Sequence, residues 1–401
     1  MSPVSILPPL AVLAIAFATA SLLTWKFGAP STRGRNSSID GLRGYLAILV
    51  FLHHSSVWYY YLRSGHWGLP PSYLYTHFGQ SSVALFFMIT GYLFFSKLLD
   101  GKQNGVDFGR LFVSRVLRLV PLYLLMLVLL FSIIAILSRG TLNEPLPQLA
   151  INASHWIGFT MAAAPDVNAI ENTPIIVAGV TWSLTYEWFF YLSLPLLALT
   201  VRVPAPLPYL TLATTSVICL YFWHPESYHL APFLGGIGAA VLTRRDAFRR
   251  FSETTAASCL VLLLIGCEVT VFPTAHGIMS LVLLSLAFCL IAGGNTLFRV
   301  LVNPVSRTLG ELAYGIYLLH GIALFVAITF VLGHGDVRIM SPIAYWIMVF
   351  KLTPVLVIFS FLAHRLIEQP AMQSTNAATN WLRARLRRGV AQRHPGVQSL
   401  S

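Results

Sequence analysis

Long apolar stretches separated by short polar connections run through almost the whole chain of 401 residues. A stretch of about 20 apolar residues is long enough to cross a bilayer as a helix. We therefore predict an all-α integral membrane protein with about eleven transmembrane helices, of which the segment 229–243 is short. The stretches lie near residues 4–25, 44–62, 80–98, 119–138, 183–201, 207–223, 229–243, 255–272, 276–292, 310–331 and 347–367.

The composition agrees with this pattern. Hydrophobic residues make up 56% of the chain and charged residues only 10%, and the mean hydropathy is +0.72. A soluble domain carries about 25% charged residues, so an ordinary soluble enzyme is excluded. The four cysteines lie in apolar runs without metal-ligand spacing, and we predict packing residues and no metal site.

Membrane topology accounts for the net charge of +12. When the connections between the predicted helices are assigned alternately to the two sides, 22 of the 26 Lys and Arg residues fall on one side. Cytoplasmic connections are rich in Lys and Arg, so this side is predicted to be the cytoplasm and no nucleic-acid partner is needed. We expect a multi-pass inner-membrane protein whose basic tail, 373–401, is cytoplasmic and lies near anionic lipid.

The first apolar stretch has features of a signal peptide, with a possible cleavage site at residues 18–20. No Lys or Arg precedes it, however, and Lys26 follows it, which favours a retained helix with its N-terminus outside. Residues 1–36 are thus predicted to form an extra helix and a cytoplasmic linker. The longest connection, 139–181, contains four prolines, and we expect it to cap a site or to re-enter the membrane.

An arginine and a histidine form the most informative pair in the chain. Asp40-Gly41-Leu42-Arg43 precedes the second apolar stretch, and His54 lies eleven positions beyond Arg43. Eleven steps of about 100° return to the same helix face, about 16 Å further along the axis. Arg43 is therefore expected at the membrane edge and His54 near its middle, where an ionisable group is costly and is usually functional. His53 points about 100° away and is expected to be structural.

Two further ionisable side chains are expected at the depth of His54. His320 lies on a helix that runs outward, and Glu187 enters from the opposite side. At about 1.5 Å per residue in a core about 30 Å thick, all three lie near one plane. An acid and two imidazoles at one depth suggest a buried proton-handling site. The alternative is that each residue makes a single hydrogen bond between helices.

A second cluster is predicted on the cytoplasmic side. Arg115 and Arg118 are three residues apart, so they project from one helix face just before Pro121. Together with Arg43 they are suited to binding a phosphate-bearing cofactor through charge-assisted hydrogen bonds. The alternative is that they are ordinary basic anchors at the membrane surface.

Six separated blocks of residues, which follow one another along the chain, carry a resemblance to a known family. The chain resembles the membrane-bound acyltransferase family 3, of the polysaccharide O-acetylase type, over residues 37–372. The blocks are Asp40 to Arg43 with His54, Val83 to Gly91, Arg115 to Arg118 before Pro121, Thr181 to Trp188 with Tyr191 and Pro195, Tyr314 to His320, and Arg365 to Pro370. The first helix precedes the usual ten-helix core of the family, and no hydrolase-like domain follows residue 372.

The resemblance implies transfer of an acyl group, usually acetyl from acetyl-CoA, to a hydroxyl of a cell-envelope or secreted glycan. It implies that His54, Arg43 and Glu187 are catalytic and that Arg43, Arg115 and Arg118 bind the acyl-CoA. Asp40, Trp182, Tyr317 and His320 are candidate residues for lining the site. No metal is expected.

We hypothesise that His54 is the general base for the acceptor hydroxyl and that Glu187 orients it or stabilises its protonated form. Direct transfer and a covalent acyl intermediate both remain open. The alternative function is a proton-coupled transporter or flippase, because such proteins also carry intramembrane His and Glu, although no repeated halves are detectable here.

Overall fold

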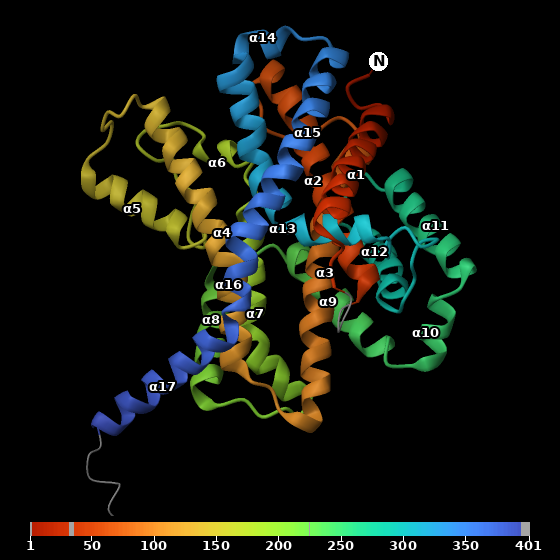
Figure 1. Cartoon of the computed structure of the whole chain (residues 1–401), viewed down its shortest axis with the longest axis vertical. Helices are drawn as coiled ribbons and strands as arrows, with labels where there is room; N and C mark the ends of the chain where they lie inside the picture. The colour runs from red at the N-terminus through yellow and green to blue at the C-terminus, as the bar shows by residue number, and fades with distance from the viewer. Residues whose placement is uncertain (1, 32–35, 224, 394–401) are drawn as a thin grey trace, which may run out of the picture.

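The structure is a computed structural model, and it describes residues 2–31, 36–223 and 225–393. Within these residues the chain is helical, and strand pairing is limited to an isolated bridge between Val167 and Ile170. The all-α prediction is therefore confirmed for this part of the chain (Figure 1). The predicted linker and basic tail include residues 32–35 and 394–401, which lie outside the described residues.

Each of the eleven predicted stretches contains a helix. These helices are α1 (Leu7–Phe27), α2 (Ser37–Ser64), α3 (Tyr73–Asn104), α4 (Phe108–Leu137), α7 (Trp182–Thr200), α8 (Leu207–Trp223), α9 (Ser227–Leu242), α11 (Thr255–Val271), α12 (Ile278–Ala292), α13 (Pro304–Val326) and α15 (Pro342–Ala363). Shorter elements connect or extend them: α5 (Leu146–Ile157), α6 (Thr173–Ile176), α10 (Asp246–Ser252), α14 (His334–Ile339), α16 (Gln369–Gln373), α17 (Thr375–Arg393) and the π-helices η1 (Ala327–Leu332) and η2 (His364–Glu368).

By length and composition, five helices in the described residues can cross a membrane, or six if the bent pair α10–α11 forms one span. The predicted count of eleven crossings is therefore not confirmed. Helices α8, α9 and α12 have only 15–17 residues, which is short for a bilayer core. Helix α2 has 28 residues but contains several polar ones. The five segments are Leu7–Phe27, Tyr73–Gln103, Phe108–Leu137, Pro304–Leu332 and Pro342–Gln373.

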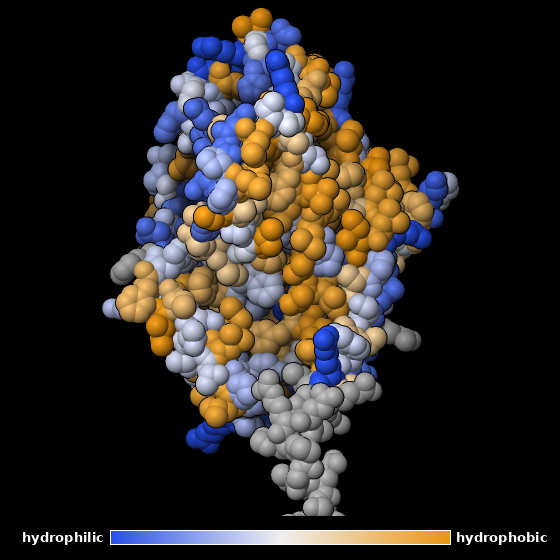
Figure 2. All heavy atoms as spheres, turned by 90° about the vertical axis from the view of Figure 1, so that its left-hand side faces the viewer, coloured by the Kyte–Doolittle hydropathy of each residue, from blue (hydrophilic) through white to orange (hydrophobic). Residues whose placement is uncertain are grey.

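Figure 2 shows apolar side chains over much of the middle of one face, with polar side chains at the top and along one edge. Several large apolar side chains of α4 and α15 are solvent-accessible in the structure, among them Val128, Ile136 and Val355. Apolar surface of this extent is stable in contact with lipid and unfavourable in water. The chain is therefore a multi-pass membrane protein.

Helices α2 and α13 are packed closely because glycines allow their backbones to approach. A Cβ atom on Gly44 would lie 2.6 Å from the Cβ atom of Leu309, and one on Gly41 or Gly310 would overlap a backbone carbonyl oxygen of the other segment. Small residues allow such close packing between membrane helices. This packing sets the positions of Arg43 and His54 on α2 relative to His320 on α13.

The N-terminal helix α1 packs against α13 and α15. Thr24 and Thr308 share a hydrogen bond of 2.7 Å, and the indole N–H of Trp346 donates to the carbonyl of Pro3 at 2.9 Å. The start of α1 thus lies beside the start of α15. The extra helix is an integrated part of the bundle.

The long connection 139–181 folds over one side of the bundle and includes α5 and α6. Trp156 is fully buried, and its indole N–H donates to the carbonyl of Pro165 at 2.9 Å. Near the end of the connection, Val180 lines a pocket that contains His54. The expectation that this connection caps a site is consistent with that position.

Candidate active site

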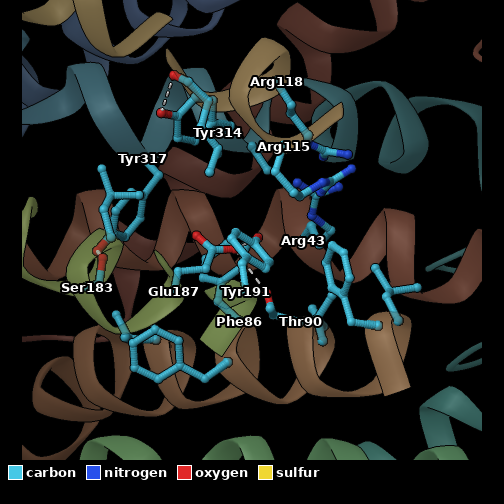
Figure 3. Close-up of a pocket in the computed structure, with 18 residues that line it drawn as sticks. Arg43, Phe86, Thr90, Arg115, Arg118, Ser183, Glu187, Tyr191, Tyr314 and Tyr317 are labelled. Carbon is cyan, nitrogen blue, oxygen red and sulfur yellow. Dashed lines mark hydrogen bonds between the residues drawn. The ribbon is translucent and has the colours of Figure 1, made fainter. Parts of the chain in front are cut away.

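The first cavity, here called the arginine pocket, lies among α2, α3, α4, α7 and α13 (Figure 3). Its volume is about 90 Å³, whereas one ordered water needs about 10–15 Å³. The pocket therefore has room for a narrow ligand segment. It is lined by Arg43, Val83, Phe86, Phe87, Ile89, Thr90, Leu93, Phe94, Arg115, Arg118, Leu119, Ser183, Leu184, Glu187, Tyr191, Ala313, Tyr314 and Tyr317.

Three guanidinium groups gather at one end of this pocket. Arg43 extends from α2, and Arg115 and Arg118 extend from one face of α4 (Figure 3). The Arg115 guanidinium lies over the ring of Phe94, 5.0 Å from its centroid. Its buried Nε has no hydrogen-bond partner among the described residues. A buried donor without a partner costs about 1–3 kcal/mol, so this end of the pocket is suited to an anionic ligand.

Glu187 is the acid of the arginine pocket. Its Oε1 accepts hydrogen bonds from the hydroxyl of Thr90 at 3.0 Å and from the hydroxyl of Tyr191, one turn further along α7. Figure 3 places these three side chains between the arginines and the Ser183–Tyr317 pair. Glu187 therefore contributes negative charge beside a cluster of cations.

The second cavity, here called the histidine pocket, follows the arginine pocket along α3. Gly79 and Gln80 of α3 line it, whereas Thr90, Leu93 and Phe94 of the same helix line the arginine pocket. Its volume is about 100 Å³. It is lined by Val50, His53, His54, Gly79, Gln80, Val83, Ala84, Phe87, Val180, Trp182, Tyr228, His229, Pro232, Ala275, His276 and Tyr317.

Val83, Phe87 and Tyr317 line both pockets, so the two cavities meet at these side chains. The Tyr317 hydroxyl is 2.7 Å from the hydroxyl of Ser183, and it also donates to the carbonyl of Val180 at 3.3 Å. These contacts hold the Tyr317 ring at the junction. A ligand that occupies both pockets would pass these side chains.

His54 and His320 are directly hydrogen-bonded. His320 is fully buried, and its Nδ1 lies 3.1 Å from the carbonyl oxygen of Ile316. A carbonyl only accepts, so Nδ1 of His320 carries a proton and Nε2 is free to accept. Nε2 of His320 lies 3.0 Å from Nδ1 of His54, which is also 3.2 Å from the carbonyl oxygen of Val50.

These contacts determine the tautomer of His54. Both neighbours of its Nδ1 are acceptors, so we assign the proton to Nδ1 and the lone pair to Nε2. His54 is half-buried and lines the histidine pocket. An imidazole with an unprotonated Nε2 in a cavity can act as a general base towards a ligand there.

The structure brings together some of the predicted site residues and separates others. Arg43, Arg115 and Arg118 share one pocket, and His54 and His320 form a pair. Glu187 does not join that pair: it lines the arginine pocket and not the histidine pocket, and its carboxylate bonds to Thr90 and Tyr191. The expected grouping of Glu187 with the two histidines was wrong because equal depth does not make side chains of different helices face one another.

The remaining candidates are placed as follows. Trp182 and Tyr317 line the histidine pocket. Asp40 lines neither pocket, and its backbone carbonyl lies against Gly310 at the α2–α13 contact. His53 donates from Nδ1 to the carbonyl of Tyr75 at 2.7 Å, as a structural residue would, and its ring also lines the histidine pocket.

Sequence reasoning missed several residues of the histidine pocket, above all Gln80, Tyr228, His229 and His276. They lie on α3, at the start of α9 and in the α11–α12 connection. No motif or regular spacing joins them, so the sequence offered no signal. In the described part of the chain, no group of three or more His, Cys, Asp or Glu side chains could hold a metal ion.

Comparisons with known proteins identify the family of the chain. Residues 36–365 match the family model of the acyltransferase 3 type, described as an acyltransferase domain. The chain is 25% identical over 393 residues to "Acyltransferase MdmB" of Streptomyces mycarofaciens, covering 84% of this chain and 92% of that protein. It is 22% identical over 384 residues to "Putative O-acetyltransferase SACOL0978" of Staphylococcus aureus (strain COL), covering 86% of this chain and 58% of that protein.

No solved structure matches the chain. The family model nevertheless spans most of it, and the chain therefore belongs to the acyltransferase 3 family of membrane-bound O-acyltransferases.

Proposed function

We propose that this protein moves an acyl group, most simply acetyl, from cytoplasmic acyl-CoA to a hydroxyl of a cell-envelope or secreted glycan on the other side of the inner membrane. The observation that carries the proposal is the pair of pockets that meet at Val83, Phe87 and Tyr317. One pocket has three arginines, and the other has the lone pair of His54. Such an arrangement lets only the acyl group cross, while the charged donor stays on its own side.

The arginine pocket fits the donor. Arg43, Arg115 and Arg118 would hold the CoA phosphates, because guanidinium groups bind phosphate by paired charge-assisted hydrogen bonds. The buried Nε of Arg115, which lacks a partner among the described residues, supports an anionic ligand there. In this proposal the pantetheine arm and the thioester occupy the pocket, and the larger nucleotide stays at its mouth.

The histidine pocket provides the base. Nε2 of His54 accepts the proton of the acceptor hydroxyl as the oxygen attacks the thioester carbonyl. The new carbon–oxygen bond forms, the carbon–sulfur bond breaks, and the CoA thiolate leaves with a proton from the His54 imidazolium. His320 accepts from Nδ1 of His54 throughout and keeps its ring in the reactive orientation.

Acetyl-CoA turnover by the purified protein in lipid nanodiscs tests the proposal. With a glycan extract as acceptor, we expect release of the free CoA thiol and a mass increase of the glycan by one acetyl group. His54→Ala should abolish both without loss of folding, because it removes the base. His66→Ala is the matched control, since His66 is an exposed histidine at the end of α2 that lines neither pocket.

Full activity of His54→Ala would show that the His54 imidazole takes no part in the reaction. Family membership already disfavours the transporter alternative, because the relatives carry acyltransferase names. The transporter alternative would be favoured again if the purified protein moved a glycan across the membrane and left acetyl-CoA unchanged.

A further inference from the structure

The outer part of the histidine pocket contains a group of rings that the chemistry above does not use. Trp182 stands at the start of α7, Tyr228 and His229 at the start of α9, and His276 in the connection between α11 and α12. The rings contact one another, with centroid distances of 4.3 Å for Trp182–His229 and 4.1 Å for Tyr228–His276. We call these four residues the ring cluster.

The ring cluster is open on one side. The side chains of Trp182 and His276 are exposed, and those of Tyr228 and His229 are half-buried. All four line the same cavity as His54. A ligand can thus enter past the rings and place one of its atoms near Nε2 of His54.

The α11–α12 connection, which carries His276, is held in place by hydrogen bonds from α3. The carboxamide oxygen of Gln80 accepts from the backbone N–H of Ala275 at 3.0 Å, and Nε2 of His77 donates to the carbonyl of Phe272 at 2.7 Å. Nδ1 of the same His77 lies 2.7 Å from the buried carboxylate of Glu268 on α11. The connection is therefore preorganised, which lowers the entropic cost of binding a ligand.

The lining of the histidine pocket contains no Asp, Glu, Lys or Arg among the described residues. A charged group that loses its water without gaining a counter-ion costs several kcal/mol. Hydroxyl groups, in contrast, can pair with the ring nitrogens of His229 and His276, the Tyr228 hydroxyl and the Gln80 amide. The faces of Trp182 and Tyr228 supply rigid apolar surface for the C–H face of a sugar ring.

We propose that the ring cluster is the acceptor subsite and that it binds an uncharged sugar ring with one hydroxyl directed to Nε2 of His54. This inference rests on the proposed function and adds to it the chemical class of the sugar unit that is acylated. We expect a uronic or sialic acid unit to be disfavoured at this position, because the described lining residues include no Arg or Lys to pair with its carboxylate. Charged units elsewhere in the glycan are compatible with it.

Direct binding to the full-length protein in nanodiscs tests the subsite without relying on catalysis. The probes are methyl glycosides of neutral hexopyranoses and of the matching hexuronic acids, observed by saturation-transfer NMR. We expect the neutral glycosides to bind at least about tenfold more tightly than their uronate partners. Trp182→Ala with Tyr228→Ala should lose this binding, whereas Trp182→Phe with Tyr228→Phe should retain most of it, because the rings remain.

Trp25→Ala is the control, because Trp25 is a highly exposed indole on α1, away from the pocket. In the turnover assay, the double alanine variant should raise the KM for the acceptor and leave the KM for acetyl-CoA unchanged. Equal binding of uronates and neutral glycosides, or unchanged binding by the double alanine variant, would overturn the subsite. Glycoside binding without release of CoA thiol would support the subsite and contradict the proposed function.

Discussion

The His54–His320 pair is the most specific feature among the individual residues. In many hydrolytic sites a carboxylate holds the Nδ1–H of the base, whereas here the Nε2 of a second, buried histidine does so. That histidine is itself oriented by the carbonyl of Ile316. The His54 ring is therefore positioned by neutral groups, and no buried carboxylate has to be desolvated beside it.

His320 is therefore predicted to be a positioning residue. His320→Phe removes one of the two acceptors at Nδ1 of His54 and leaves the carbonyl of Val50. We expect kcat to fall by a factor on the order of 10², because the ring is held less firmly in the reactive tautomer and orientation. His320→Gln offers a carboxamide oxygen to the same N–H and should recover part of the loss. Steady-state kinetics with both substrates check this, and the KM for acetyl-CoA should not change. Equal activity of the His320→Phe variant and the wild-type protein would show that His320 is only a packing residue.

Arg115 and Arg118 are predicted to act on donor affinity. Loss of one charge-assisted hydrogen bond costs about 1.5–3 kcal/mol, so Arg115→Ala should weaken CoA binding by about 10- to 100-fold. Arg115→Lys should be intermediate because it keeps the charge without the planar fork. Isothermal titration with CoA provides the measurement. Arg385→Ala is the control, because Arg385 is exposed on α17 and lines neither pocket. Unchanged affinity in Arg115→Ala with Arg118→Ala would return both residues to the role of membrane anchors.

Among the helices, α2 and α13 carry the side chains of the candidate site whose relative positions matter most. Arg43 and His54 lie on one, and Tyr317 and His320 lie on the other. Gly41 of the Asp40-Gly41-Leu42-Arg43 motif and Gly44, which follows the motif, therefore have a packing role, since both lie against the segment 301–310. This segment combines Arg43, which lines the arginine pocket, with the small residues that bring two helices together.

Substitution at this contact is predicted to damage stability and activity together. Gly44→Leu would place atoms within 3 Å of Leu309, and overpacking of this kind costs about 1–3 kcal/mol or more. We expect a lower Tm and weaker CoA binding, because Arg43 moves with α2. Gly266→Ala on α11 is the control, since a Cβ there meets no atom within 4 Å. Thermal unfolding followed by intrinsic fluorescence measures the difference, and equal Tm values for the two variants would contradict the packing role.

For the molecule as a whole, the end-to-end order of the two pockets along α3 is the feature that matters most. Gly79 and Phe94 are separated by fifteen residues, or about 22 Å of helix, which is most of the thickness of a bilayer core. In the proposed reaction, the donor and the acceptor would approach from opposite sides without either crossing completely.

This order predicts sided activity in proteoliposomes. Acetyl-CoA should be consumed only when it is supplied on the side of the basic connections, which include Arg244 and Arg249, and the acceptor should react only from the other side. Protease accessibility of the C-terminal segment gives the orientation of the inserted protein. Permeabilising the vesicles with detergent is the control and should remove the sidedness. Consumption of acetyl-CoA added to the opposite side alone would contradict the proposed route.

The apolar stretches, the basic connections and the residue blocks were sufficient to predict an all-helical membrane protein, its family and the grouping of Arg43, Arg115 and Arg118. These features depend on local patterns, because a run of apolar residues must satisfy its backbone hydrogen bonds internally as a helix. The pairing of His54 with His320 and the separation of Glu187 from both were decided by the tertiary structure. Helix rotation and the glycine contacts between helices determine which side chains face one another, and these are set by packing across long distances in the chain. For the same reason only the folded structure brings Trp182, Tyr228, His229 and His276 into one pocket.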